Sequence, residues 1–154
     1  MKILMVCLGN ICRSPLAEGI MKAKAKKYQL DMEVDSAGTA AYHEGELPDI
    51  RSMEVAAKND IDLSDQRARK FQTADFDHFD KIFAMDRYNF SDLAAKARNG
   101  NDSGKLEMIL NKTQPGENRD VPDPYYGGED GFDKVYKMLD EACEVIAREI
   151  ANGV

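Results

Sequence analysis

The sequence predicts an α/β protein, in which a central sheet of four parallel strands is covered by helices on both faces. Three observations favour this class. Short apolar runs alternate with segments of helical periodicity, the last segment carries one long apolar stripe, and 154 residues with 43% hydrophobic content suit one packed core. We therefore expect a three-layer sandwich formed by a single domain over residues 1–154.

The four strands are expected at residues 2–6, 32–37, 80–85 and 105–110, where short apolar runs are bounded by polar or turn-forming residues. The first of them, KILMV, is expected to be a buried strand. Ligands of open parallel sheets bind beyond the carboxyl ends of the strands. The residues that follow Val6 are accordingly the first place to look for function.

Helices are expected between these strands and after the last one. Proline suits the first turn of a helix, so SP at 14–15 predicts a helix that runs to about residue 28. Further helices are expected around 50–58 and 87–98, with a break at the polar and glycine residues 100–104. From residue 130 onward, apolar residues recur at steps of three and four, which predicts a terminal helix that packs Cys143 into the core.

Composition limits the partners of the chain. Acidic residues outnumber basic ones by 28 to 21, and the resulting net charge of −7 disfavours nucleic acid and anionic membranes as partners. The apolar run at the N-terminus is too short for a secretory signal or a membrane span, so we expect no membrane insertion and a cytoplasmic location. Three cysteines without a C-x-x-C pair predict neither a disulfide framework nor a zinc site.

The stretch VCLGNICRSP at residues 6–15 carries the chemistry. It joins the first strand to the first helix, where unpaired backbone N–H groups and the helix dipole favour an anion. The same field and the charge of Arg13 favour the thiolate form of Cys7. A tetrahedral phosphate fits this loop, with Arg13 making a planar two-bond contact. The other residues expected to surround the phosphate are Leu8, Gly9, Asn10, Ile11, Cys12 and Ser14.

Individual residues of the loop suit its tight shape. Gly9 lets the loop curl inward without a Cβ clash, and Asn10 tolerates a left-handed conformation. The Ser14 hydroxyl is placed to donate to the thiolate. The loop lacks the G-x-x-x-x-G-K-[ST] pattern of nucleotide-binding loops, and His43 and His78 are the only histidines. We therefore expect no metal and no cofactor.

The loop resembles the C-x5-R-S motif that low molecular weight protein tyrosine phosphatases carry at their N-terminus. DPYY at 123–126 is similar to the general-acid loop of that family. DSAGT at 35–39, IDLSDQRAR at 61–69 and FAMDRYN at 83–89 are similar to further family blocks in the same order. The resemblance thus covers nearly the whole chain, points to a bacterial member, and implies a flavodoxin-like sheet with the strand order 2-1-3-4.

The resemblance implies a reaction without metal. Cys7 would attack phosphorus to give a cysteinyl phosphate, while Asp123, protonated at first, would give its proton to the leaving phenol oxygen. The carboxylate of Asp123 would then activate the water that hydrolyses the intermediate. Arg13 and the loop amides would stabilise the transferring phosphoryl group.

The resemblance also implies the walls of the site. Tyr42 and Tyr125 would flank the substrate ring, Tyr126 is expected beside them, and Ser36 would support Asn10. A deep aromatic slot favours phosphotyrosine, so the implied substrate is a phosphotyrosine protein, with a bacterial tyrosine kinase as one candidate and inorganic phosphate as the product.

Two other functions are compatible with parts of the pattern. A thiol-dependent arsenate reductase would need two resolving cysteines after Cys7, and only Cys12 and Cys143 remain. A phosphotyrosine-binding module without turnover would need neither the nucleophile nor the acid Asp123. The family resemblance further implies that Cys12 could protect Cys7 from over-oxidation through a reversible disulfide.

Overall fold

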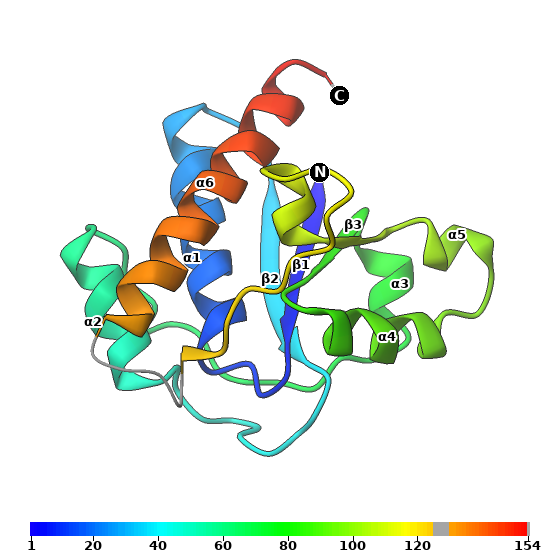
Figure 1. Cartoon of the computed structure of the whole chain (residues 1–154), viewed down its shortest axis with the longest axis horizontal. Helices are drawn as coiled ribbons and strands as arrows, with labels where there is room; N and C mark the ends of the chain where they lie inside the picture. Colours follow the sequence, from blue (N-terminus) through cyan, green and yellow to red (C-terminus); the bar gives the residue numbers. More distant parts are fainter. Residues whose placement is uncertain (125–129, 154) are drawn as a thin grey trace.

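The structure, a computed structural model, describes residues 1–124 and 130–153. Four parallel strands form one sheet in the order β2-β1-β3-β4, between two layers of helices (Figure 1). This confirms the predicted α/β class and the strand order 2-1-3-4. The strands are β1 (Lys2–Cys7), β2 (Glu33–Gly38), β3 (Lys81–Ala84) and β4 (Leu106–Met108).

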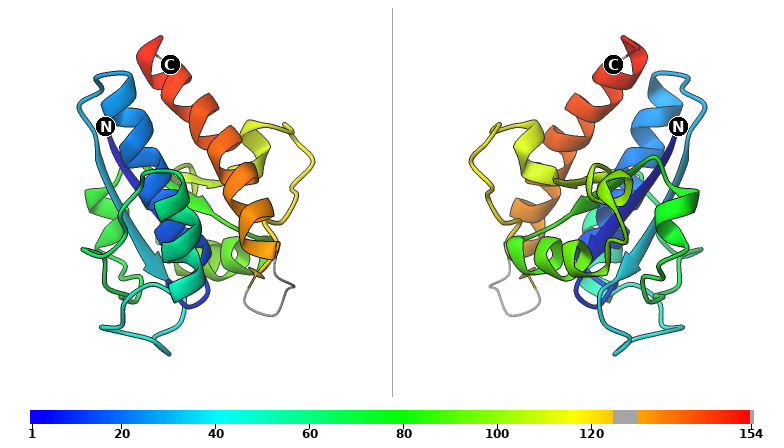
Figure 2. Two further views of the ribbon diagram at one scale, coloured as in Figure 1. Left: turned by 90° about the vertical axis from the view of Figure 1, so that its left-hand side faces the viewer. Right: turned by 90° about the vertical axis from the view of Figure 1, so that its right-hand side faces the viewer.

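The helices form two layers. One layer lies on each side of the sheet (Figures 1 and 2). The first layer contains α1 (Arg13–Lys27), α2 (Ile50–Lys58) and α6 (Gly131–Ala151). The second contains α3 (Asp75–His78), α4 (Arg87–Lys96) and α5 (Gly100–Ser103), and a 3-10 helix, η1 (Ile109–Lys112), follows β4.

Strand β1 shows why the sheet needs both layers. Successive side chains of a strand point to opposite faces. Ile3 and Met5 belong to the core beneath α1 and α6, whereas Leu4 and Val6 belong to the core beneath α3 and α4, and all four are fully buried. Cys7 ends the strand on the α1 side and is 3% exposed. The packing of β1 thus fixes the position of the thiol.

Several predicted bounds differ from the structure by one residue, and three predictions were wrong by more than that. The predicted break at 100–104 contains the short helix α5, which the Asn99 side chain caps by accepting a hydrogen bond from the backbone of Asp102. Strand β4 ends at Met108 rather than at residue 110, because Ile109 and Leu110 turn into η1 and pack into the core with α6. Helix α4 ends at Lys96 rather than at residue 98.

Helices α1 and α6 run side by side along the sheet (Figure 2), and Cys143 lies fully buried between them and the sheet, as predicted. Glu144 joins the exposed edges of the two helices. Hydrogen bonds from the Tyr28 hydroxyl, Lys24 and Arg148 hold the pKa of this carboxyl at about 2, below its ordinary value of 4.5. The contacts stabilise the ionised form of Glu144 in the folded protein only.

This lowered pKa predicts a pH-dependent contribution to stability. Because the folded pKa lies below the unfolded one, the contribution is complete above about pH 4.5 and disappears as the pH falls toward 2. After allowance for solvent screening, Glu144→Gln should lower the free energy of unfolding by about 1 kcal/mol at pH 7. Urea unfolding at pH 7 and near pH 2.5 measures this difference. The exposed Glu141→Gln is the matched control, and a Glu144→Gln deficit of equal size at both pH values would contradict the assignment.

Candidate active site

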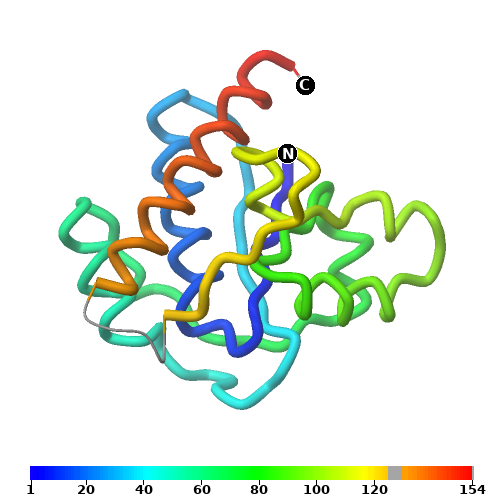
Figure 3. The backbone as a smooth tube through the Cα atoms, in the orientation of Figure 1, coloured from blue at the N-terminus to red at the C-terminus, as the bar shows by residue number. Residues whose placement is uncertain are grey.

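The loop at residues 7–13 connects β1 to α1 at the carboxyl edge of the sheet. Strand β1 is central, and its neighbours β2 and β3 lie on opposite sides. The chain therefore changes direction across the sheet at β1, which is where open α/β sheets bind ligands. In the backbone tube of Figure 3 the loop lies below the blue strand, in the lower half of the molecule and above the cyan segment that follows β2. The predicted position after strand 1 is confirmed.

Asn10 is the residue that turns the loop. Its φ of 56° is in the left-handed region, which the sequence predicted for this position. The side-chain amide donates hydrogen bonds to the hydroxyls of Ser14, at 2.8 Å, and Ser36, at 3.0 Å. Its oxygen accepts from the backbone N–H of Arg69 at 3.0 Å. One side chain thus ties the loop to α1, to β2 and to the segment after α2.

Two glycines allow close approaches to the loop. A Cβ on Gly9 would lie 3.2 Å from the ring carbon Cδ2 of His43, so the glycine leaves room for that side chain. A Cβ on Gly38 would lie 2.7 Å from the carbonyl oxygen of Leu8, which is closer than such contacts occur. Gly38 was not predicted as a site residue, although it lies in the DSAGT block. Its importance follows from the β1–β2 register, in which Gly38 pairs with Cys7.

The Cys7 thiol lies beside a hydroxyl. Its Sγ is 3.0 Å from Oγ of Ser14, whose oxygen already accepts a hydrogen bond from Asn10. The single hydrogen of Ser14 is therefore available to the sulfur. Donation to sulfur stabilises a thiolate more than a thiol. This geometry fits the role that the sequence predicted for Ser14.

A buried carboxyl group extends this network. The Ser36 hydroxyl, which accepts from Asn10, donates to Oε1 of Glu18 at 2.6 Å. Glu18 is 4% exposed and pairs with Lys22, and burial raises its pKa. Glu18 was not predicted as a site residue. It could have been noticed because it is an acidic residue, one turn after Ser14, on a helix face that is otherwise buried.

Arg13 is held by acidic and carbonyl oxygens. Its side chain is 4% exposed, and Nη1 donates to Asp86 at 2.7 Å and to the carbonyl of Val121 at 2.9 Å. Burial opposes the charge of Arg13, but the Cys7 thiolate and the Asp86 carboxylate outweigh it and raise the pKa of the guanidinium. Asp86 was also missed. It lies two residues after the end of β3, and its place near the carboxyl end of a strand next to β1 was the feature that could have indicated it.

Asp123 reaches the loop from a distant part of the chain. The backbone N–H of Val121 donates to the carbonyl of Met85 at 2.8 Å, which brings this segment to the end of β3. Oδ2 of Asp123 then lies 3.9 Å from Nη2 of Arg13. The Asp123 side chain is 39% exposed, so solvent can reach it.

These groups surround a cavity of about 210 Å³. Tyr42, which is 78% exposed, and His43 form part of its rim. Asn10 and Ser14 are buried behind the loop rather than in the cavity wall. The other lining residues are Cys7, Leu8, Gly9, Ile11, Cys12, Arg13 and Asp123. Tyr125 and Tyr126, predicted as substrate-binding residues, lie outside the described part of the chain.

Cys12 differs from Cys7 in its environment. It is 5% exposed, and burial, followed by the charge of Asp49, raises the pKa of its thiol to about 12. Cys12 is therefore a neutral thiol at physiological pH. Both thiols are free, so the Cys7–Cys12 disulfide stays a prediction.

Two kinds of feature are absent from residues 1–124 and 130–153. No group of three or more histidine, cysteine, aspartate or glutamate side chains is arranged to hold a metal ion. Within the same residues, no helix combines the length and the apolar character that crossing a bilayer requires.

A thiol, a buried guanidinium and a carboxylate that line one cavity are typical of the class of cysteine-dependent phosphatases. Comparison with known proteins identifies the family within this class. The family model described as "Low molecular weight phosphotyrosine protein phosphatase" matches residues 2–154. The chain belongs to this family and is a hydrolase of phosphotyrosine.

Relatives and solved structures agree with this family. A low molecular weight phosphotyrosine protein phosphatase from Schizosaccharomyces pombe is 40% identical over 153 residues, which cover 97% of each chain. The crystal structure of a protein tyrosine phosphatase from Entamoeba histolytica is 39% identical, with a TM-score of 0.92 over 99% of this chain and 98% of that one. A Drosophila arginine phosphatase is also similar in structure, at 32% identity and a TM-score of 0.90 over 97% and 98% of the two chains.

Proposed function

We propose that the chain hydrolyses phosphotyrosine through a cysteinyl phosphate on Cys7. The observation that carries this proposal is that the Cys7 thiol, the Arg13 guanidinium and the Asp123 carboxylate line one small cavity at the end of β1. A nucleophile, a phosphoryl-binding cation and an acid are the groups that metal-free phosphoryl transfer to a thiol requires.

The phosphoryl group binds on the loop. Its three outer oxygens accept hydrogen bonds from loop amides, while the planar guanidinium of Arg13 binds two of them. Asp86 and the Val121 carbonyl occupy Nη1 of Arg13, which fixes the orientation of the plane. The guanidinium and the amides stabilise the negative charge on the phosphoryl oxygens in the transition state.

The reaction has two steps. In the first, the sulfur of Cys7 bonds to phosphorus as the bond from phosphorus to the phenol oxygen breaks, and Asp123 gives its proton to that oxygen. In the second, the Asp123 carboxylate takes a proton from water, the water oxygen bonds to phosphorus, and the sulfur leaves as a thiolate. Inorganic phosphate is the product. The Ser14 hydroxyl, 3.0 Å from Sγ, stabilises the thiolate in both steps.

The substrate ring lies between the loop and the rim. We assign one wall of the slot to Tyr42, whose exposed side chain lines the cavity, and retain Tyr125 and Tyr126 as proposed contacts. Because a similar structure is that of an arginine phosphatase, phosphoarginine is the substrate to compare. Hydrolysis of matched phosphotyrosine and phosphoarginine peptides, in excess EDTA, tests the proposal. Faster release of phosphate from phosphotyrosine is expected, and a preference for phosphoarginine would contradict it.

Replacing Asp123 should separate substrates by their leaving groups. In Asp123→Ala, kcat/KM for phosphotyrosine should fall by about 10²- to 10⁴-fold, because tyrosine leaves poorly without a proton. The value for p-nitrophenyl phosphate should fall much less, because p-nitrophenolate leaves without one. Steady-state kinetics on the two substrates measure the contrast. Equal losses on both substrates would contradict the role of Asp123 as the acid.

The arsenate reductase alternative is less well supported. That reaction needs two further thiols in reach of Cys7. Cys143 is fully buried in α6 and cannot approach the loop without unfolding of that helix. The phosphotyrosine-binding alternative is also less well supported. Binding alone would give no chemical role to the Cys7 thiol or the Asp123 carboxylate, although both line the cavity.

We further propose that the chain acts in the cytoplasm on a phosphotyrosine protein, with an autophosphorylated bacterial tyrosine kinase as the candidate. A reducing compartment suits a mechanism that depends on a free thiolate at Cys7. Such a kinase presents aryl phosphates on exposed tyrosines, which can reach the active-site cavity. Dephosphorylation of a purified kinase, followed by anti-phosphotyrosine blotting, tests this partner, and persistence of its phosphotyrosine would contradict it.

A further inference from the structure

A second groove, of about 420 Å³, continues from the active-site cavity toward α4. Leu8, Arg13 and Asp123 line both spaces, so a substrate held on the loop can extend directly into the groove. The proposed mechanism gives the rest of the groove no role. Its position suggests contact with a substrate residue that flanks the phosphotyrosine.

One face of α4 presents an aromatic ring and a carboxylate to this groove. Tyr88 and Asp92 are four residues apart and therefore lie above one another on the helix. Tyr88 is 79% exposed, the largest exposure among the large apolar and aromatic side chains that are described. Asp92 is exposed, and its carboxylate forms no hydrogen bond or ion pair with another described residue. A ring beside a carboxylate suits a guanidinium, which can stack on the ring while it donates hydrogen bonds.

Asn89 supplies an independent sign of a ligand. This residue lines the groove between Tyr88 and Asp92, yet it is only 1% exposed. Its Oδ1 atom has no hydrogen-bond partner among the residues that the structure describes. A buried acceptor without a donor is costly, and a ligand N–H group would remove that cost. A ligand that binds both this acceptor and the Asp92 carboxylate needs several N–H donors.

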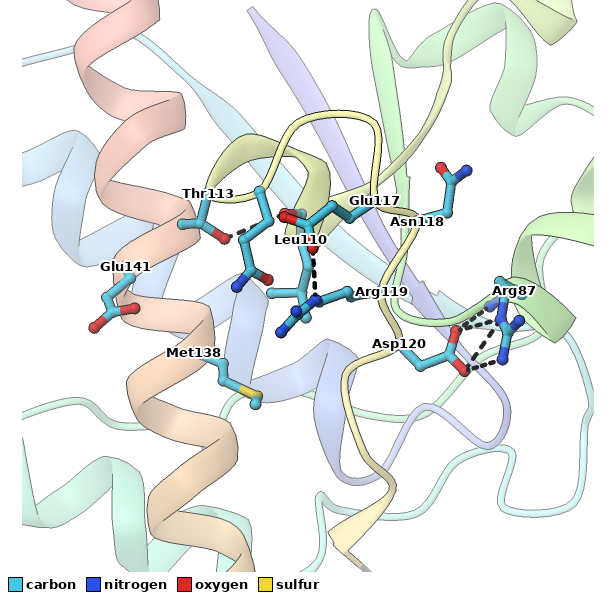
Figure 4. Close-up of a pocket in the computed structure, with 10 residues that line it drawn as sticks. Arg87, Leu110, Thr113, Glu117, Asn118, Arg119, Asp120, Met138 and Glu141 are labelled. Carbon is cyan, nitrogen blue, oxygen red and sulfur yellow. Dashed lines mark hydrogen bonds and ion pairs between the residues drawn. The ribbon is translucent and has the colours of Figure 1, made fainter.

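The other charges near the groove already have partners. Asp86 binds Arg13, and Asp120 forms an ion pair with Arg87 (Figure 4). Asp92 thus gives the outer groove a negative charge that a basic side chain would neutralise. Figure 4 shows a larger cavity, of about 650 Å³, in which the positive charges are already paired. Its two arginines bind acidic residues of the same cavity.

We propose that this groove binds an arginine side chain next to the phosphotyrosine of the substrate, which makes Tyr88, Asn89 and Asp92 determinants of specificity. The guanidinium stacks on the Tyr88 ring and donates hydrogen bonds to the Asp92 carboxylate and to Oδ1 of Asn89. Arginine is favoured over lysine, because a planar group with five donors can make these contacts together. The inference rests on the proposed function, since it describes a substrate of the same site.

A peptide series tests this inference. Phosphotyrosine peptides carry arginine, lysine, alanine or glutamate at each flanking position in turn, and kcat/KM is measured at low and high salt. For the best position we expect arginine to exceed alanine by about three- to tenfold at low salt, the size of one exposed ion pair combined with one cation–π contact. High salt should reduce this ratio.

Variants assign the preference to the groove. Asp92→Asn and Tyr88→Ala should each reduce the arginine-to-alanine ratio, and Asp92→Lys should make glutamate the preferred neighbour. Asp31→Lys is the matched control, because this exposed aspartate precedes β2 at the opposite edge of the sheet and should leave the ratio unchanged. Each ratio is taken within one variant, so a general loss of activity does not affect it.

Three results would overturn the inference. Equal turnover of all phosphotyrosine peptides by the wild type would overturn it and leave the proposed function intact. So would an arginine preference that survives in Asp92→Lys, since the preference would then arise elsewhere. Turnover of no phosphotyrosine peptide would overturn the proposed function and this inference together.

Discussion

Replacing Cys7 with serine is expected to reduce phosphotyrosine hydrolysis by roughly 10⁵- to 10⁶-fold, the usual loss when a nucleophile is removed. Serine keeps the size of the side chain and the hydrogen bond with Ser14, so the loop should stay folded. An alcohol, however, is far less ionised than a thiol beside the same cation. The measurement is phosphate release from a phosphotyrosine peptide at saturating substrate, in excess EDTA.

The control for this variant is another cysteine. Cys143→Ala removes a thiol that is buried in α6 and does not line the active-site cavity, so it should retain activity within a few-fold. Binding provides a second check, because the loop amides and Arg13 remain in Cys7→Ser. The variant should therefore still bind a phosphotyrosine peptide in calorimetry. Residual turnover above about 1% of the wild-type rate would show that Cys7 is not the nucleophile.

Replacing Arg13 with lysine is expected to reduce kcat/KM by about 10³-fold, although the charge is kept. Lysine offers a point charge in place of a planar fork, so it cannot bind two phosphoryl oxygens in a fixed orientation. It also cannot satisfy Asp86 and the Val121 carbonyl while it contacts the substrate. Part of the loss should therefore appear in kcat, because the contact strengthens in the transition state.

A matched substitution tests whether the loss is specific. Arg119→Lys changes an exposed arginine on the segment that leads to Asp123, and it should leave kcat/KM within twofold. Thermal unfolding of Arg13→Lys should be measured in parallel, because Asp86 loses its partner. If Arg13→Lys kept kcat/KM within tenfold of wild type in a folded protein, a bidentate role for Arg13 would be contradicted.

Much of the fold could be predicted because its long elements carry periodic patterns. Helix α6 is unambiguous in the sequence because its burial follows the period of 3.6 residues, and strand β1 is unambiguous because it is a short run that is apolar on both faces. Helices α3 and α5 have four residues each, too few to show a period. Helix α5 depends on Asp102, which is 1% exposed and accepts hydrogen bonds from Arg98. Arg98 also binds Asp77, which is 21 residues away, and a contact over that distance has no local signature.

The site was predictable where it is contiguous in the sequence. The loop carries Cys7, Arg13 and Ser14 within eight residues, so their chemistry could be argued from spacing. Glu18 and Asp86 could not be assigned in this way. Glu18 lies on α1 and reaches the loop through Ser36 of β2. Asp86 contacts Arg13 only because β3 lies beside β1. Their roles depend on sheet order and register, which a single sequence specifies only in outline.

The cysteinyl phosphate is the central claim, and trapping it is the most direct test. In Asp123→Ala, p-nitrophenyl phosphate should phosphorylate the enzyme readily, whereas hydrolysis of the intermediate should be slow because its base is missing. Acid quenching within the first turnovers, followed by peptide mass spectrometry, locates any phosphoryl group. The account predicts one phosphoryl group on Cys7, and none after the same treatment of Asp123→Ala that also carries Cys7→Ser. A phosphoryl group on another residue, or a burst of p-nitrophenol without any phosphoenzyme, would contradict it.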